Sequence, residues 1–173
     1  MRAATWLTTA TIAFLACTLV NAPAAGAVQP EPAPPADARV VREVQGGGAQ
    51  VYTCDMTAAG AFAWVLVGPR AVLVNEDGSD FGTHSAGPTW TAVDGSSIRA
   101  DGAHPLVKID HQQSVPSLLL QVTSSSGEGV LSGVRFVRRT DTEGGLAPPT
   151  GCDAAHMNDM RAIHYSAIYT FYR

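Results

Sequence analysis

The chain has 173 residues, a net charge of −4 and three cysteines. This length accommodates one domain that buries a sizeable core without needing a metal ion for its stability. Lys108 is the only lysine, and Arg138 and Arg139 are the only adjacent basic residues. A mildly acidic chain without a basic cluster argues against nucleic acid and against anionic membrane surfaces as partners.

The N-terminal segment predicts export from the cytoplasm. Arg2 precedes an uncharged apolar stretch, which is followed by small residues. This pattern is typical of a signal peptide, so we expect residues 1–27 to be removed by cleavage after Ala27, with Ala24 as the second choice. A spanning helix and a lipid-modified Cys17 are alternatives, although the apolar stretch is short for a bilayer. The expected location is secreted or extracytoplasmic, with no transmembrane segment after processing.

Residues 28–38 are rich in proline, which favours an extended linker, and residues 39–173 are predicted to form one β-rich domain. Once the signal peptide is removed, Cys54 and Cys152 remain, and we expect them to form a disulfide in an oxidising compartment. Closing a loop of about a hundred residues stabilises a fold by roughly 4–5 kcal/mol in the chain-entropy model. A redox pair of free thiols is the alternative, but it favours a short spacing such as Cys-x-x-Cys.

Beyond the linker, short apolar runs alternate with turn residues. In chain order, the expected strands cover residues 49–54, 62–67, 71–74, 89–93, 117–123, 130–138 and 164–172. Gly46–Gly48 is expected to separate two strands, and Gly68–Pro69 is expected to end one. Asp77–Gly78 and Asp94–Gly95 are typical of hairpin turns. Residues 153–162 are a weak helix candidate with poor periodicity.

This pattern predicts the all-β fold class, as a single-domain β-sandwich or partly closed β-barrel of roughly eight to eleven strands with one disulfide. The last expected strand is aromatic on both faces, with Tyr165, Tyr169 and Phe171 on one of them. Because such a strand at an edge invites aggregation, we expect it in the middle of the sheet. We expect its aromatic side chains to pack in the core, and the alternative is that they line a ligand site inside a barrel.

Three stretches resemble a known family. They are the run Gln50–Cys54, the run Gly82–Ser96 with its Gly-Thr-His, Gly-Pro-Thr-Trp and Asp-Gly-Ser motifs, and the C-terminal part from Leu118 to Arg173. In this order and spacing they resemble the secreted bacterial and fungal proteins classified as domain of unknown function 3455. The resemblance implies a secreted β-rich fold and no known activity. Departures from the family lie at Ser117, where a tryptophan is usual, and in residues 103–114.

Some members of that family carry the name malate dehydrogenase, a name that this sequence does not support. It has no Gly-x-Gly-x-x-Gly turn after a strand and no βαβ pattern. We therefore predict that the chain is not a dehydrogenase, and we predict no cofactor.

The run from Gly82 to Ser96 is the most suggestive candidate site. Its glycines and proline predict a tight, well-defined loop that carries His84, Trp90 and Asp94. An exposed tryptophan stacks on a sugar ring or another flat apolar ligand, while histidine and aspartate supply polar contacts. The predicted ligand-binding residues are therefore these three. The structural alternative is that Trp90 belongs to the core and His84 stabilises a turn.

Catalytic and metal chemistry have weaker support, so we predict no catalytic residue and no metal ligand. Ser85 lies in a run that misses the Gly-x-Ser-x-Gly elbow by one residue, and a triad with Asp110 and His164 has no supporting spacing. The five histidines are scattered, without the close spacing of a zinc site. Asp77 and Asp80 lie near turns, where aspartate usually bonds its own backbone. The three arginines at 135, 138 and 139 are expected on a solvated strand face.

Together these features favour a secreted or envelope-associated β domain that acts as a non-catalytic ligand- or surface-binding module. The expected partner is a glycan, a small apolar molecule or an envelope component. One alternative is a small secreted hydrolase that acts on a carbohydrate or envelope substrate. Another is a structural surface protein that has no ligand.

Overall fold

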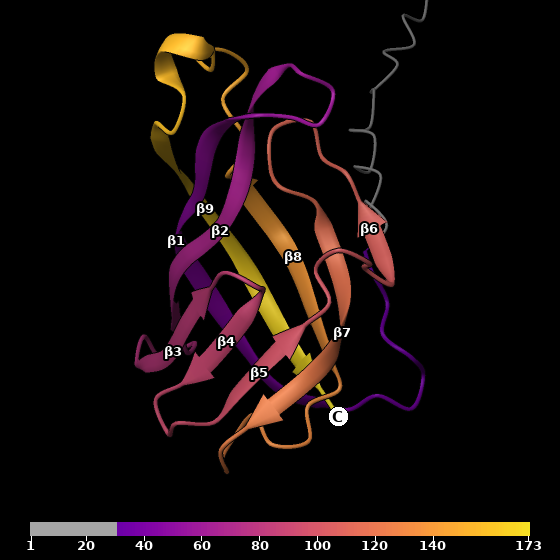
Figure 1. The fold of residues 1–173 in the computed structure, drawn as a ribbon. Coiled ribbons are helices and arrows are strands. Elements are labelled where there is room, and N and C mark those ends of the chain that lie inside the picture. Colours follow the sequence, from indigo (N-terminus) through magenta and orange to yellow (C-terminus); the bar gives the residue numbers. More distant parts are fainter. Residues whose placement is uncertain (1–30) are drawn as a thin grey trace, which may run out of the picture.

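The computed structural model describes residues 31–173 (Figure 1), which form nine strands and one short 3-10 helix, η1 (Ala154–His156). The predicted signal peptide lies outside the described residues. In the described part of the predicted linker, Pro32 is buried and Glu31 pairs with Arg138. No helix within residues 31–173 is long and apolar enough to cross a membrane. The strands are β1 (Val40–Met56), β2 (Phe62–Val74), β3 (Asp80–Ser85), β4 (Thr89–Ala92), β5 (Ser97–Ala100), β6 (Val107–Ile109), β7 (Ser117–Ser126), β8 (Phe136–Gly144) and β9 (Met160–Tyr172).

All nine strands belong to one antiparallel sheet with the order β5-β4-β3-β2-β1-β9-β8-β7-β6. β5 also pairs with the second part of β7, from Val122 to Ser126, and this pairing closes the sheet partly into a ring. β6 pairs with the first part of β7, from Ser117 to Leu119, and lies beside the ring as an edge strand. Figure 1 shows β3, β4 and β5 at the front and β9 behind them. The predicted all-β fold is confirmed in its partly closed barrel form.

β9 lies between β1 and β8, so the prediction that the aromatic strand is central is confirmed. Its alternation places Tyr165, Tyr169 and Phe171 on one face, and all three are fully buried. Phe171 stacks on Phe81 of β3, with ring centroids 5.6 Å apart. β9 therefore contributes a row of aromatic rings to the interior of the ring, and these rings join strands that are distant in the sequence.

β1 runs through Gly46–Gly48 without interruption, so the predicted break there was wrong. Gly46 pairs with Leu73 of β2 and with Ala167 of β9. The ring of Tyr169 occupies the space above it, because a Cβ atom at Gly46 would lie 2.6 Å from Tyr169 Cε2. Glycine is required at this position by the neighbouring aromatic ring, and the strand does not end there.

β2 likewise continues through Gly68–Pro69, where a strand end was predicted. β1 and β2 shift register between Val51 and Tyr52, which is a β-bulge that accommodates the irregular residues. β3 pairs with β2 only from Ala71 to Val74, so the other side of Pro69 has no neighbouring strand. A sheet tolerates proline in such a position.

Three further predictions differ from the structure. The strand expected at 89–93 is present as β4, but β3, β5 and β6 were not predicted, so the expected loop after Gly82 is mostly a hairpin of β3 and β4. The strand expected at 130–138 begins only at Phe136, because Leu131 and Val134 are buried in a turn. Their hydrophobicity reflects burial at one end of the ring and not strand pairing. The helix candidate at 153–162 is limited to η1.

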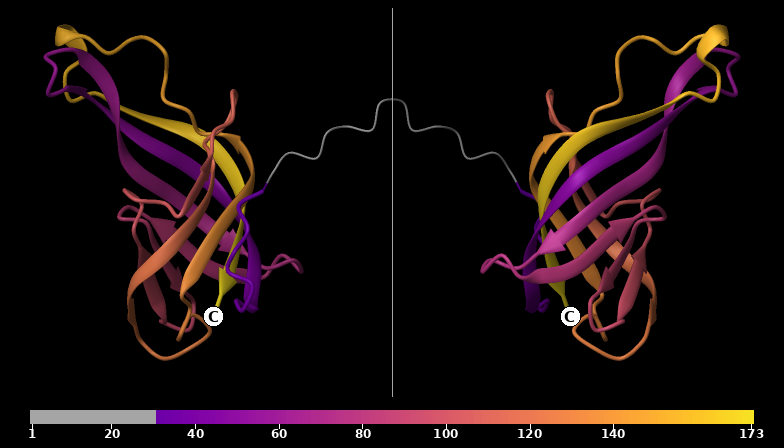
Figure 2. Two further views of the ribbon diagram at one scale, coloured as in Figure 1. Left: turned by 90° about the vertical axis from the view of Figure 1, so that its right-hand side faces the viewer. Right: turned by 90° about the vertical axis from the view of Figure 1, so that its left-hand side faces the viewer.

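Cys54 of β1 and Cys152, in the connection between β8 and β9, form the predicted disulfide across a sequence separation of 98 residues. Figure 2 shows that this end of β1, β2 and β9 projects beyond the rest of the ring. The same connection accepts a hydrogen bond at the carbonyl of Thr150 from Trp64 Nε1, at 2.9 Å. The projecting strands are therefore attached to the β8–β9 connection by one covalent bond and one indole hydrogen bond.

We predict that Gly46→Ala lowers the free energy of unfolding by about 1–3 kcal/mol, because the added methyl group overpacks the interior against Tyr169. Gly47→Ala is the matched control, since nothing lies within 4 Å of a Cβ atom there. Urea unfolding of both variants checks the difference. Equal stability of the two variants would contradict the packing role of Gly46.

The disulfide closes a loop of 98 residues, so Cys54→Ala/Cys152→Ala is expected to lose about 4–5 kcal/mol of unfolding free energy. Urea midpoints measured with and without a reducing agent check this expectation. The reductant should lower the midpoint of the natural chain and leave that of the double variant unchanged. If it lowered neither midpoint, the bond would not be a stabilising one.

Candidate functional site

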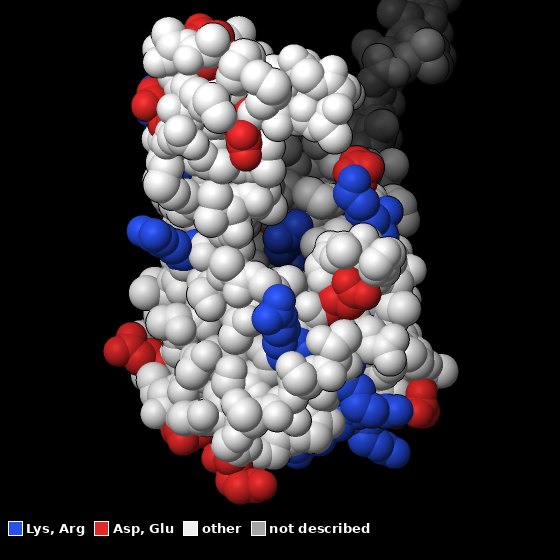
Figure 3. Space-filling model, in the orientation of Figure 1, with Lys and Arg blue, Asp and Glu red and all other residues white. Residues whose placement is uncertain are grey.

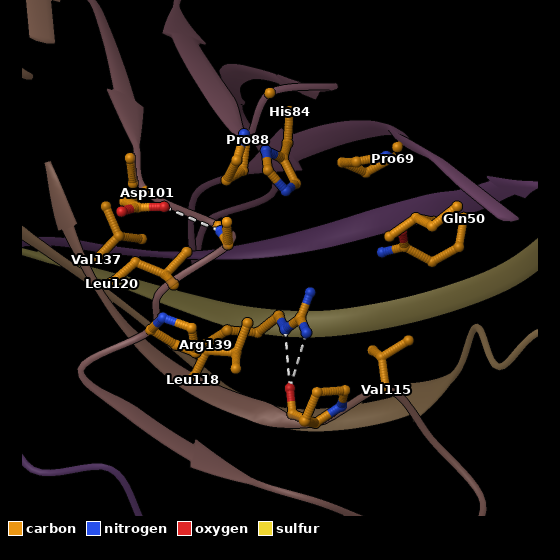
Figure 4. Close-up of a pocket in the computed structure, with 18 of the residues that line it drawn as sticks. Gln50, Pro69, His84, Pro88, Asp101, Val115, Leu118, Leu120, Val137 and Arg139 are labelled. Carbon is orange, nitrogen blue, oxygen red and sulfur yellow. Dashed lines mark hydrogen bonds between the residues drawn. The ribbon is translucent and has the colours of Figure 1, made fainter. Parts of the chain in front are cut away.

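A cavity of about 840 Å³ lies inside the ring and is lined by residues from all nine strands (Figure 4). This volume is in the range of sites that bind small molecules. The residues that line it are Gln50, Tyr52, Leu66, Val67, Gly68, Pro69, His84, Gly87, Pro88, Trp90, Arg99, Ala100, Asp101, Gly102, Ala103, Pro105, Lys108, Val115, Pro116, Leu118, Leu120, Thr123, Val137, Arg139, Leu146 and Tyr169.

Most of the cavity wall is apolar. Leu120 and Val137 are direct partners across β7 and β8, and Leu118 lies two residues before Leu120, on the same face of β7. Leu66 and Leu146 line the cavity and also remain exposed, at 53% and 39%. Exposed leucines in the wall of a cavity offer an apolar entrance to a ligand.

Stacked aromatic rings form one wall of the cavity. His84 and Trp90 are direct partners across β3 and β4, and their rings stack with centroids 4.3 Å apart. Tyr169 packs edge-on against both rings. Trp90 is only 1% exposed, and its indole Nε1 has no hydrogen-bond partner within the part of the chain that the structure describes. The structure therefore brings two of the three predicted ligand-binding residues together, buried in the wall of the cavity.

His84 is uncharged at neutral pH. Its Nδ1 lies 2.9 Å from the carbonyl oxygen of Thr89, which only accepts, so Nδ1 carries the proton and Nε2 is a free acceptor. Burial lowers the pKa of His84 from 6.5 to about 4; the hydrogen bond that its ring donates to Thr89 opposes this shift, and the positive charge of Arg139 adds to it. Figure 4 shows the ring of His84 directed into the cavity.

Arg139 provides a positive charge in the opposite wall. It is half-buried, and its Nε and Nη2 donate to the carbonyl oxygen of Pro116, at 3.0 and 2.9 Å. Figure 4 shows the remaining nitrogen of the guanidinium group pointing across the cavity towards His84. On the face drawn in Figure 3, lysine and arginine atoms lie inside and beside a recess near the middle of the molecule.

Asp94, the third predicted residue, lies away from the cavity in the turn between β4 and β5. Its carboxylate accepts hydrogen bonds from Ser96 N and Oγ, at 2.9 and 2.6 Å, and from Val130 N at 2.7 Å. The hydrogen bonds from Ser96 and Val130 hold the pKa of Asp94 below its usual value. This carboxylate joins the β4–β5 turn to the connection that follows β7.

A comparison with known protein families shows which family the chain belongs to. Residues 35–173 match the family model described as "Protein of unknown function (DUF3455)". The chain belongs to this family. Neither the curated proteins nor the solved structures contain a significant match. Membership of the DUF3455 family thus covers the whole ring but supplies no activity.

The other chemical groups weighed from the sequence do not converge in this DUF3455 domain. No hydrogen bond joins any two of Ser85, Asp110 and His164 in the described structure. Within residues 31–173 no group of three or more histidine, cysteine or acidic side chains is arranged to hold a metal ion. Asp77 bonds Ser79 within its own turn, as expected for a turn aspartate.

Arg139 is the residue that the sequence interpretation missed, because all three arginines were expected on a solvated face. The alternation of side chains along β8 could have indicated that Arg139 points inwards. Val137 is 1% exposed, so the residue two positions later points to the same interior side. Arg138 lies between them and points the other way, where it pairs with Glu31 and Glu43. Two adjacent arginines in a strand cannot both face solvent when the sheet closes on itself.

The lowered pKa of His84 predicts a pH dependence of stability. Because the unfolded chain binds a proton more readily between pH 6.5 and pH 4, the contribution of His84 is complete above about pH 6.5 and is lost as the pH falls. We expect roughly 3 kcal/mol of loss from this group. Urea unfolding between pH 7 and pH 4 measures it. His84→Phe should remove that part of the slope, and His164→Phe, at an exposed position, should retain it. Identical slopes for both variants would contradict the assignment.

Proposed function

We propose that this domain binds a small, largely apolar molecule in the cavity inside the ring, and that it does so outside the cytoplasm. The observation that carries the proposal is a cavity of about 840 Å³ that has apolar walls and a few polar groups facing into it. This combination is typical of sites for small molecules. The signal-peptide pattern supports the extracytoplasmic location.

The open, apolar wall supports a binding role over a purely structural one. The cavity is open to solvent, since its wall includes the exposed Leu66, Arg99 and Leu146. Its apolar surface therefore stays in contact with water when no ligand is bound, and apolar recesses of this kind mark binding sites. The buried positions of His84 and Trp90 are compatible with a structural role for those two rings. The apolar recess beside them is the feature that favours a ligand.

A hydrolase has less support from the geometry. Asp101 is the one carboxylate that lines the cavity among residues 31–173. Its oxygens accept hydrogen bonds from the backbone N–H groups of Ala103 and His104 and contact the ring of His104. Cleavage by paired acids needs two carboxyl groups that face one groove. We therefore prefer binding without catalysis.

The proposal is tested with N-phenyl-1-naphthylamine, a neutral dye whose fluorescence increases in apolar surroundings. We expect saturable binding to the natural chain, and at least a tenfold weaker affinity for Leu118→Trp. The larger side chain at Leu118, a half-buried position in the cavity wall, occupies the space that the dye would need. Val72→Trp is the matched control, because Val72 is 61% exposed on β2.

Melting curves of both variants show whether each one is folded before its affinity is interpreted. A natural chain that binds no dye would overturn the proposal. Equal dye affinities of Leu118→Trp and Val72→Trp would place the dye outside the cavity and would overturn it as well.

A further inference from the structure

The strongest unexplained feature of the cavity is the charge of Arg139. Nε and Nη2 of the guanidinium group both donate hydrogen bonds to the carbonyl oxygen of Pro116, which is neutral. The remaining nitrogen of the guanidinium group faces the open space in Figure 4. Taking a cation out of water is costly unless the cation meets a negative charge, and proteins usually supply one.

No such charge accompanies Arg139 in the described part of the chain. None of the ion pairs among residues 31–173 includes Arg139, at a limit of 4.0 Å between nitrogen and oxygen. The neighbouring Arg138 is different, since Glu31 and Glu43 lie 3.6 and 4.0 Å from its nitrogens. Two adjacent arginines of one strand thus have opposite environments. Arg139, which faces the cavity, has no acidic partner among the described residues.

The other ionisable groups of the cavity wall do not neutralise Arg139. Tyr52 and Tyr169 lie near its charge, but burial raises the pKa of both hydroxyls, so they are neutral at pH 7. The carboxylate of Asp101 already accepts hydrogen bonds from the backbone of its own turn and contacts the ring of His104. Lys108 adds a positive charge and pairs with Asp110 outside the cavity wall, at 2.8 Å. Arg99 is exposed and adds another positive charge at the wall. The cavity wall therefore carries a net positive charge, although the chain as a whole carries −4.

We infer that the ligand of this cavity is an apolar carboxylic acid, bound as its carboxylate with the head group at Arg139 and the hydrocarbon part along the apolar walls. The inference rests on the proposed function and specifies the class of ligand. Pro116 takes one N–H each from Nε and Nη2, so Nη1 and the second N–H of Nη2 remain at the end of the planar group. These two groups can donate two parallel hydrogen bonds to one carboxylate, which a lysine ammonium group does not do. Figure 4 shows Gln50 directed into the same space, where its amide supplies a further polar contact.

The dimensions and chemistry of the wall support this orientation. Leu118 is the direct partner of Arg139 across β7 and β8, and Leu120 and Val137 continue the same apolar surface. The charge therefore lies beside a continuous hydrocarbon wall. A molecule that meets both requirements has an anionic head and an apolar body. A glycan would leave the leucine wall without a partner.

The test compares two ligands that share the same ten-carbon chain, decanoate below its micellar concentration and 1-decanol below its solubility limit, at pH 7.5. Each displaces N-phenyl-1-naphthylamine from the natural chain, and the dye is neutral in every arm. We expect decanoate to bind at least about tenfold more tightly than 1-decanol, as a charge-assisted hydrogen bond predicts. This comparison requires no variant, so it decides the inference even if a substitution of Arg139 prevents folding.

Two variants assign the preference to a residue. Arg139→Gln should bring the ratio of the two affinities close to one while leaving dye binding in place. Arg138→Gln is the matched control, since it removes the same charge from the opposite face of β8 and should leave the ratio unchanged. Arg139→Lys should retain only part of the preference, because its ammonium group lacks the planar fork.

The outcomes separate the inference from the proposed function. If the natural chain did not bind the dye, both the proposed function and the carboxylate inference would be overturned. Dye binding with equal displacement by decanoate and 1-decanol would overturn the carboxylate inference and leave the apolar site intact. A preference for decanoate that survives in Arg139→Gln would overturn the role of Arg139.

Discussion

The pairing between β5 and the second part of β7 is the contact on which the rest of the structure depends. Eight strands follow one another around the sheet, and only the register from Ser97↔Ser126 to Ala100↔Val122 brings the two ends together. Without this contact the inward faces of β3, β4 and β8 would belong to an open sheet, and solvent would reach the buried rings of His84 and Trp90. Closure turns these faces into an interior and gives that interior a size that the side chains do not fill.

The interior is divided into a packed part and an open part, and the division follows the distribution of side chains. Tyr165, Phe171 and Phe81 fill one part with stacked and edge-on rings, and Leu131 closes one end. Towards the other end, the cavity is lined by glycine and proline in β2 and by small residues after β5. Selection for stability alone would favour larger side chains here, because substitutions that fill a cavity commonly stabilise a protein. The retained space is compatible with occupation by another molecule.

The sequence predicted the fold class, the disulfide and the central aromatic strand, because burial on a closed sheet leaves a strong period-two pattern in Tyr165, Tyr169 and Phe171. It failed where one residue serves a neighbour that is distant in the sequence. Gly46 looked like a strand break because its partner Tyr169 lies 123 positions away. Val134 looked like part of a strand because burial in a turn has the same composition as burial in a sheet. For Trp90, the sequence indicated a bulky aromatic residue but not whether it packs in a wall or projects from the surface.

The connection from β8 to β9 affects how a ligand would enter and leave. This segment carries Leu146 at the cavity wall and Cys152 in the disulfide, so a covalent bond limits its movement. On the other side, β6 has three residues and pairs only with β7. Local opening requires the least free energy where few bonds must break, so the β6 side is the easier one to open. A molecule that leaves past β6 would need only the fraying of one short strand, whereas the entrance at Leu146 lies beside a segment that the disulfide holds in place.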